Sequence, residues 1–447
     1  MDGRGQTRIL AFAWAILLAA CGPGGSGREE TFSSDSQSTP TVTPTTPSPI
    51  VDDQPPATPG VLEPTPVQVG TGTPQPTPMA PLFQPGFNEA LRWSYSASSV
   101  TTFRLRVPVD RAGKRVRLAF RSGDGSLTVN RVTVALAGPN GALASSPVAV
   151  TFGGKAGFST ANRVRTVSDA IPFTVGFRDE LAVSFEATGA LAESAIETLP
   201  GSYMRAGSYA TTPGALGGTA WAIGIGLATV DVEGSPARSF IALGDSITEG
   251  YITGHDDTRN AWPELTGTQL GVPVVNAGVS GQGFYDELQN LDQEVLSLQG
   301  YTDCVILLGT NDLGSLDITG LKTRMGVLIS RLQPRCRTWV STLLPKEKTN
   351  YGDYNTVKEE RVEFNAWIRE TYASTLIDLE AVTRQPDNVH MYISGYTVDG
   401  IHPSARGHQV MAAEVVRVLR AAGVVPQDGV TPSSGTTSTS SDTPASP

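Results

Sequence analysis

Two hydrophobic patterns follow one another along the chain. Between about residues 87 and 235, apolar and polar positions alternate with a period of two. These alternating runs are residues 102–107, 115–120, 127–136, 173–177 and 181–185, with a longer run at 221–232. Turn residues separate them, as at 123–125 and 138–141. Short alternating runs between turns are typical of half-buried antiparallel strands, so we expect an all-β sandwich or jelly-roll domain over residues 87–235.

From residue 236 to residue 426, short apolar runs alternate with amphipathic stretches of helix length. The apolar runs at 239–243, 272–276, 304–308, 338–343 and 376–377 predict buried strands. Helices are expected between them, among them 321–332, 357–370 and one near Trp262. Ser404 can cap the last helix and Gly423 can end it. The alternation predicts a three-layer α/β/α domain with a parallel sheet, whose active site lies at the carboxyl ends of the strands.

The two ends of the chain have neither pattern. Arg4 and Arg8 precede an apolar run of about a dozen residues, shorter than the ~20 that span a bilayer, so residues 1–20 are expected to be a signal peptide. The run ends at Ala19-Ala20-Cys21, which resembles a bacterial lipobox and predicts lipidation of Cys21; an ordinary secretory signal is the alternative. Residues 21–86 and 427–447 are rich in Pro, Thr and Ser and are expected to be a disordered linker and tail.

The composition argues against some classes of function. With 33 basic and 43 acidic residues the net charge is −10, which argues against nucleic-acid binding. Four histidines and three cysteines do not suggest a metal centre, and we expect neither a metal nor a cofactor. Cys304 and Cys336 begin neighbouring predicted strands, so they either form a disulfide in an oxidising compartment or are two small buried apolar residues.

Four polar blocks carry the candidate chemistry. Three of them, at 244–250, 276–281 and 309–312, directly follow predicted strands, and the fourth lies at 399–403, before the last helix. Their order and content resemble the SGNH, or GDSL-type, serine esterases (acylhydrolases), and the resemblance covers essentially all of the second domain. It implies a flavodoxin-like fold and a carboxylic ester hydrolase.

Serine catalysis explains these residue types. A serine hydroxyl needs a base to take its proton, and the base needs a third group to orient it. We expect Ser246, His402 and Asp399 to fill these roles. The resemblance further implies an oxyanion hole made by the N–H groups of Ser246 and Gly281 and the side-chain amide of Asn311.

Single residues outside these roles have simpler interpretations. Asp245 and Asp312 are expected to shape their turns. His408 is expected to lie on a face of the last helix, and residues 255–257 in a solvated loop rather than in a cation site. Residues 150–154 and 166–169 resemble a non-catalytic domain that precedes the SGNH domain in some secreted bacterial hydrolases.

Together these observations predict a secreted, lipid-anchored esterase of the cell envelope, facing the periplasm or the exterior. Bacterial carbohydrate esterases with a jelly roll before the SGNH domain show a similar architecture, and no amphipathic lid helix is evident. The leading substrate is therefore a short acyl group, such as O-acetyl, on a carbohydrate. A lipid or lysophospholipid acylhydrolase is the first alternative. A glycan-binding surface lipoprotein with a vestigial esterase is the second. The sequence does not specify the oligomeric state.

Overall fold

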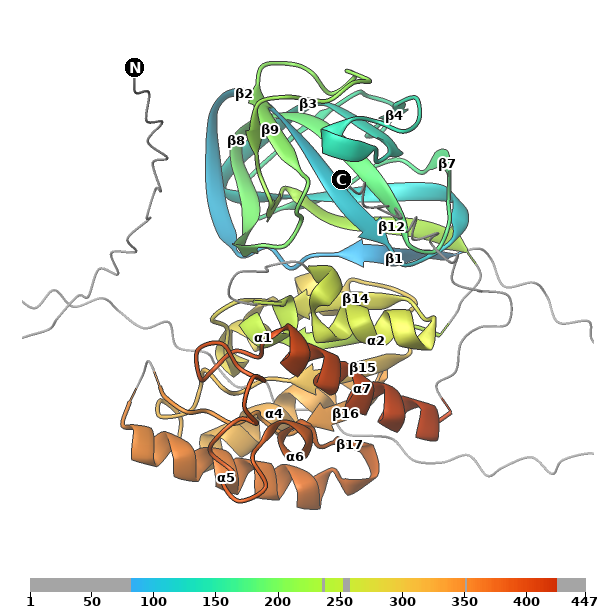
Figure 1. Ribbon diagram of the computed structural model, residues 1–447. Coiled ribbons are helices and arrows are strands. Elements are labelled where there is room, and N and C mark those ends of the chain that lie inside the picture. Colours follow the sequence, from blue (N-terminus) through green and yellow to red (C-terminus); the bar gives the residue numbers. More distant parts are fainter. Residues whose placement is uncertain (1–81, 235–237, 252–257, 350–351, 424–447) are drawn as a thin grey trace, which may run out of the picture. The chain divides into compact units, whose positions relative to one another are not determined.

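The computed structural model describes residues 82–234, 238–251, 258–349 and 352–423. These residues belong to one compact unit, 76–447, and form an antiparallel β domain followed by an α/β domain (Figure 1). The expected signal peptide, Cys21, nearly all of the linker, the loop at 255–257 and the tail lie outside the described residues. Among the helices that are described, none is both long enough and apolar enough to cross a membrane.

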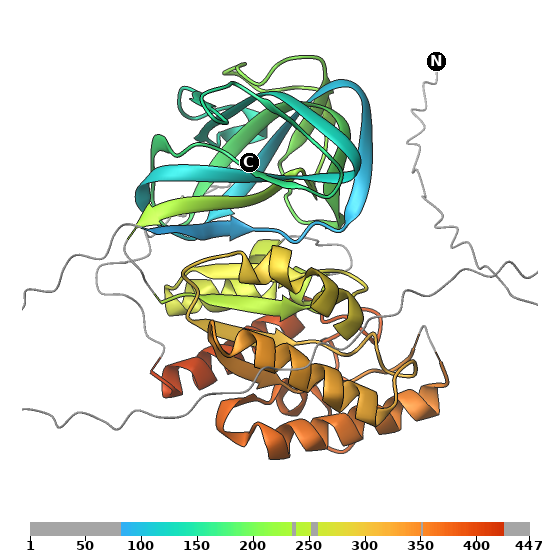
Figure 2. The ribbon, with the colours of Figure 1, turned by 180° about the vertical axis from the view of Figure 1, so that it is seen from behind.

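The first domain is a large antiparallel sheet that curls around an apolar core (Figures 1 and 2). The long central strands pair in the order β12-β3-β8-β2, and alternate residues of these strands, such as Phe103, Phe120 and Phe185, meet inside. The strands are β1 Leu82–Asn88, β2 Trp93–Val109, β3 Gly113–Leu136, β4 Val148–Val150, β5 Phe158–Thr160, β6 Arg165–Val167, β7 Ile171–Val175, β8 Asp179–Glu197, β9 Tyr203–Ala206, β10 Thr219–Ala220, β11 Ile223–Ile225 and β12 Leu227–Gly234.

Three local features of this domain differ from the expectation. The turn expected at 123–125 lies inside β3, where residues 123–126 bulge opposite a single residue of β8. The run at 221–232 is divided into β11 and β12 by Gly226, which has φ +68°. The domain also begins earlier than residue 87, because β1 pairs with β12 from Leu82 onward. Pro85 and Gly86 were expected to belong to the linker. They lie in β1 instead, because an edge strand with a bulge accommodates both residues.

The second domain has the expected three layers. Its parallel strands are β13 Phe240–Gly244, β14 Val274–Gly278, β15 Asp303–Leu307, β16 Arg337–Ser341 and β17 Leu376–Ile377. Their order, β14-β13-β15-β16-β17, is the flavodoxin-like order and confirms the predicted fold. The helices are α1 Ser246–Glu249, α2 Trp262–Leu270, α3 Phe284–Leu291, α4 Ile318–Leu332, α5 Tyr354–Thr371, α6 Leu379–Thr383 and α7 Ala405–Ala421. Helices α2 and α7 lie side by side on one face of the sheet, and α3 and α4 cover the other (Figures 1 and 2).

Local signals place the ends of these elements. The Ser404 hydroxyl accepts a hydrogen bond from the N–H of Gly407 and so caps α7, and Gly423 follows the helix with φ +78°. Both were expected.

Cys304 in β15 and Cys336, which directly precedes β16, are joined in a disulfide with Cα atoms 5.8 Å apart.

Candidate active site

Ser246 lies on a tight turn between β13 and α1. Asp245 is the N-cap of α1, and its carboxylate accepts a hydrogen bond of 2.9 Å from the N–H of Ile247. Gly244 leaves no room for a side chain, because a Cβ atom there would lie 2.1 Å from the Thr248 hydroxyl and 2.5 Å from the Leu307 carbonyl oxygen. The turn therefore holds Ser246 as the first residue of the helix, at the carboxyl end of a central strand.

Ser246, His402 and Asp399 form a hydrogen-bonded series. The Ser246 Oγ lies 3.0 Å from His402 Nε2, and His402 Nδ1 lies 2.9 Å from Asp399 Oδ2. The other carboxylate oxygen of Asp399 accepts the backbone N–H groups of Ile401, at 2.9 Å, and of His402, at 2.7 Å. Because each ring nitrogen of His402 has a hydrogen-bond partner, the orientation of the imidazole is fixed.

Asp399 is held in its charged form. Partial burial would raise the pKa of its carboxyl, but the hydrogen bonds from the backbone and ring of His402 and from Ile401 outweigh burial, so the pKa of Asp399 lies below its ordinary value. An ionised Asp399 accepts the Nδ1–H of His402 and leaves Nε2 free to accept the serine proton.

Further contacts fix the histidine loop. The ring of Tyr251 meets the His402 ring edge-on, with centroids 4.4 Å apart. The hydroxyl of buried Tyr392 donates to the Ile401 carbonyl oxygen at 2.7 Å, and the Thr397 hydroxyl donates to the His402 carbonyl oxygen at 2.8 Å. The sequence did not indicate these three residues.

The expected oxyanion-hole residues lie at the ends of the strands that flank β13. Gly281 follows β14 and Asn311 follows β15, so the loops that carry them and Ser246 lie at the same edge of the sheet. Gly281 has φ +79° and its Cα faces open space. Asn311 Nδ2 donates one hydrogen to the carbonyl oxygen of Gln282 at 3.0 Å. An amide nitrogen has a second hydrogen, which is available for a substrate oxygen.

Two further carboxyls shape the turns, as expected. Burial raises the pKa of Asp245 to about 7, with Asp312 adding to the effect and the N–H of Ile247 and the ammonium of Lys346 opposing it. Asp312 accepts the N–H of Phe284 at the start of α3, and burial raises the pKa of Asp312 to about 6.

His408 has a structural role in the fold. His408 lies on the inner face of α7, fully buried, and its Nδ1 accepts the N–H of Trp262 at 3.2 Å. Burial lowers the pKa of His408 to about 3. Among the residues that the structure describes, no group of three or more His, Cys, Asp or Glu side chains is arranged to hold a metal ion.

Buried polar residues that the sequence did not indicate connect the blocks. Gln282 donates from Nε2 to the Gly244 carbonyl oxygen at 2.5 Å and to the Glu287 carboxylate at 2.8 Å. Glu249 accepts the N–H of Ser280 at 2.6 Å. The only signal for these residues was their position inside or next to the polar blocks.

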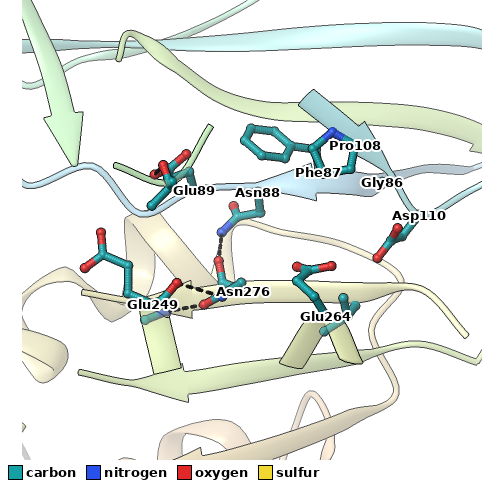
Figure 3. A pocket seen from close by; sticks show the side chains of 12 residues that line it. Gly86, Phe87, Asn88, Glu89, Pro108, Asp110, Glu249, Glu264 and Asn276 are labelled. Atoms are coloured by element: carbon teal, nitrogen blue, oxygen red, sulfur yellow. Dashed lines mark hydrogen bonds between the residues drawn. The ribbon is translucent and has the colours of Figure 1, made fainter. Parts of the chain in front are cut away.

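Asn276 links the turn of Ser246 to the first domain. Its Nδ2 donates to the Thr248 carbonyl oxygen in α1 at 2.9 Å. The backbone carbonyl oxygen of Asn276 accepts a hydrogen bond of 2.8 Å from Nδ2 of Asn88, at the end of β1 (Figure 3). The β domain therefore supports the element that carries Ser246.

Comparison with known proteins identifies one matching family. Residues 242–410 match the model of the GDSL-like lipase/acylhydrolase family. No curated protein matches the chain in sequence.

Three solved structures are among those similar to part of this chain. They are a lipase/acylhydrolase from Enterococcus faecalis (23% identity, 42% of this chain and 97% of that chain, TM-score 0.36), a member of the lipolytic protein G-D-S-L family from Veillonella parvula (20% identity, 41% and 99%, TM-score 0.35) and an acetylxylan esterase from Geobacillus stearothermophilus (18% identity, 40% and 93%, TM-score 0.33).

Proposed function

We propose that the protein hydrolyses short acyl esters of carbohydrates through an acyl-enzyme on Ser246. The match of residues 242–410 to the model of the GDSL-like lipase/acylhydrolase family supports this proposal. The observation that carries the proposal is the series of contacts from Ser246 Oγ through His402 to Asp399.

In this mechanism His402 has a defined partner for each proton transfer. His402 Nε2 takes the proton of the Ser246 hydroxyl as Oγ attacks the ester carbonyl carbon. The resulting imidazolium, stabilised by the Asp399 carboxylate, then donates that proton to the departing sugar oxygen. A water molecule repeats the sequence on the acyl-enzyme, which releases the carboxylic acid and restores Ser246.

The oxyanion is stabilised by the loops around Ser246. In this proposal the N–H groups of Ser246 and Gly281 and the second amide hydrogen of Asn311 point to the oxygen that becomes negative in the transition state. Donors that are fixed in advance stabilise this charge without reorganising during the reaction. The hydrogen bond from Asn311 to the Gln282 carbonyl fixes the amide plane.

A carbohydrate ester is favoured over a lipid by the chemistry next to Gly281. Six of the nine residues that line the cleft there have polar or charged side chains, which would lose hydrogen bonds to water if a long acyl chain covered them. The lipid acylhydrolase is therefore the second candidate, and a binding lipoprotein with a vestigial esterase the third.

We also propose that the enzyme acts at the cell envelope, anchored through lipidated Cys21. The disulfide between Cys304 and Cys336 supports an oxidising compartment, because cytosolic thiols are kept reduced. Mass spectrometry of the mature N-terminus tests the anchor: an unmodified N-terminus would contradict it.

Two assays test the activity. Ser246→Ala should abolish ester hydrolysis and labelling by a fluorophosphonate probe while the circular dichroism spectrum stays that of the wild type. Wild-type activity on nitrophenyl esters should fall as the acyl chain lengthens from two to sixteen carbons, and acetylated oligosaccharides should release acetate. A rise in activity with chain length would favour the lipid acylhydrolase, and unchanged labelling of Ser246→Ala would refute the nucleophile.

A further inference from the structure

A cleft beside the proposed oxyanion hole is lined by both domains. It has a volume of about 330 Å³ and includes Gly281 together with Arg92, Trp93 and Arg163 of the β domain. This volume lies at the lower end of the range of small-molecule sites. Because Gly281 is both a lining residue and a proposed oxyanion donor, a ligand in the cleft would lie next to the reacting ester.

We propose that this cleft binds a sugar ring of the acylated glycan, with the ring stacked on Trp93. The inference rests on the proposed function and extends it, since it assigns part of the substrate site to the β domain.

Trp93 is the residue that favours a sugar. It begins β2 and is 48% exposed, although a tryptophan side chain is normally well buried. An indole offers a flat apolar face and a polar N–H at its edge. A pyranose ring has a matching form, because its C–H groups form an apolar face and its hydroxyls project from the rim. Stacking would cover the exposed indole without burying the sugar hydroxyls.

Arg163 provides fixed hydrogen-bond donors at the same cleft. Its backbone has φ +57°, a conformation that is unfavourable for a residue other than glycine. Three contacts hold it there. Its N–H donates to the Gly123 carbonyl oxygen at 3.0 Å, Nε donates to Asp124 at 2.6 Å, and Nη1 donates to the Arg92 carbonyl oxygen at 3.2 Å. Strained residues held in this way cluster at binding sites.

The hydrolase side of the cleft supplies complementary polar groups. Asp286 and Asn290 of α3 line it, together with Ser280 and Gln282. Carboxylate and amide groups can pair with sugar hydroxyls, whereas an acyl chain would cover them without offering any hydrogen bond. Of the described residues that line the cleft, only Trp93 and Val279 have hydrophobic side chains.

Contacts between the domains keep the two sides of the cleft together. Arg92 makes a two-point ion pair with Glu294 of the hydrolase domain, with Nε 2.8 Å from Oε1 and Nη2 2.6 Å from Oε2. Arg121 binds the same carboxylate. Trp93 directly follows Arg92, so its backbone is tied to the hydrolase domain.

The test compares two kinds of substrate on the full chain. One is a panel of O-acetylated oligosaccharides built on xylose, cellobiose and N-acetylglucosamine, and the other is 4-nitrophenyl acetate. Trp93→Ala should raise the KM for an acetylated oligosaccharide about 3- to 10-fold, the value of a good aromatic contact. Trp93→Phe should restore most of this loss, and Arg163→Ala should raise the same KM. On 4-nitrophenyl acetate, which has no sugar ring, the same substitutions should change the KM by a smaller factor than on the oligosaccharide.

Arg115→Ala is the matched control, because Arg115 is an exposed arginine of the β domain that pairs with Glu233 outside the cleft. It should change neither substrate's kinetics. A direct measurement uses the inactive Ser246→Ala protein: oligosaccharide should shift its tryptophan fluorescence, and Trp93→Phe in that background should remove the shift.

The outcomes separate the two proposals. Equal KM values for wild type, Trp93→Ala and Arg163→Ala on an oligosaccharide that the wild type hydrolyses would overturn the sugar site and leave the esterase proposal standing. Cleavage of 4-nitrophenyl acetate with no acetate released from any member of the panel would overturn the carbohydrate function, and the sugar site with it.

Discussion

At the scale of single residues, the active site joins side chains that are far apart in sequence. Ser246 and His402 are separated by 156 positions, yet their side chains are 3.0 Å apart. Ser246, His402 and Asp399 could be predicted to meet because each lies in a polar block beside a strand or helix. The supporting residues were not: Gln282 and Glu249 act through contacts to other loops, and no local pattern in a single sequence indicates which loop a buried side chain will meet.

Asn311 provides a test that separates oxyanion stabilisation from the base. Its amide would donate to charge that develops only as the carbonyl is attacked, so Asn311→Ala should lower kcat far more than it raises KM. Loss of one such donor typically costs about 10²–10³ in kcat. Steady-state kinetics on 4-nitrophenyl acetate measure this change. The variant should still react with a fluorophosphonate, though more slowly, because Ser246 and His402 are unchanged. A variant with wild-type kcat would exclude Asn311 from the oxyanion hole.

At the scale of elements, strand and helix positions followed from the hydrophobic pattern where that pattern was uninterrupted. The predicted strand at 376–377 coincides with β17, and the expected cap of α7 is present. Glycine was the main source of error. Gly123 and Gly125 indicate a turn in sequence, but they lie in a bulge of β3. Gly226 divides what reads as one strand. Whether a glycine makes a turn or a bulge depends on the neighbouring strand, which the local sequence does not specify.

Two glycine substitutions should have opposite effects on stability. Gly244→Ala places a methyl group 2.1 Å from the Thr248 hydroxyl and 2.5 Å from a backbone carbonyl oxygen, so the Ser246 turn must shift. We expect it to lower the free energy of unfolding by roughly 1–3 kcal/mol, as overpacking does, and to reduce activity. Gly326→Ala is the control. Gly326 lies on an exposed position inside α4 with open space around it, and alanine there should stabilise by about 0.5–1 kcal/mol. Urea denaturation of both variants checks the signs; two equal changes would contradict the argument.

The disulfide between Cys304 and Cys336 should stabilise the hydrolase domain by restricting the unfolded chain. It joins residues that are 32 positions apart, so loop-closure entropy predicts a contribution of about 3–4 kcal/mol. The double substitution Cys304→Ala and Cys336→Ala should therefore lower the free energy of unfolding, measured in urea, by up to that amount. Reduced wild-type protein is the control and should show a similar loss. Alkylation of both thiols in the folded, unreduced protein would contradict the pairing.

At the scale of the whole molecule, composition and pattern were enough to predict two successive domains and their fold classes. They did not predict the polar contacts that join them, because these involve side chains such as Asn88 and Asn276 whose partners lie nearly two hundred positions away. These contacts connect the β domain to the turn of Ser246. The junction is therefore the part of the molecule where a change in the β domain would affect the active site.

Glu89 makes the stability of this junction depend on pH. It directly follows β1, close to Asn88 (Figure 3). Glu89 is 6% exposed and accepts the Thr198 hydroxyl at 2.5 Å. Burial raises the pKa of Glu89 to about 8, from an ordinary value of 4.5; nearby Glu249 adds to the rise, and hydrogen bonds from Thr198 and Ser194 oppose it. The folded chain thus retains a proton that the unfolded chain releases near pH 4.5. The stability that this proton supplies is complete below pH 4.5 and is lost as pH rises through about 8.

Glu89→Gln should remove this dependence, because glutamine has the shape of the protonated side chain but does not titrate. Between pH 5 and pH 8 the free energy of unfolding of the wild type should fall relative to that of the variant, by at most about 4 kcal/mol. Asp245 and Glu287 have raised pKa values of about 7, but they are present in both proteins and cancel in the difference. Urea denaturation at four pH values measures the effect. Glu363→Gln, at a side chain that is 59% exposed, is the matched control and should follow the wild type. If the Glu89→Gln and wild-type curves ran parallel from pH 5 to pH 8, Glu89 would not be the group that makes this junction sensitive to pH.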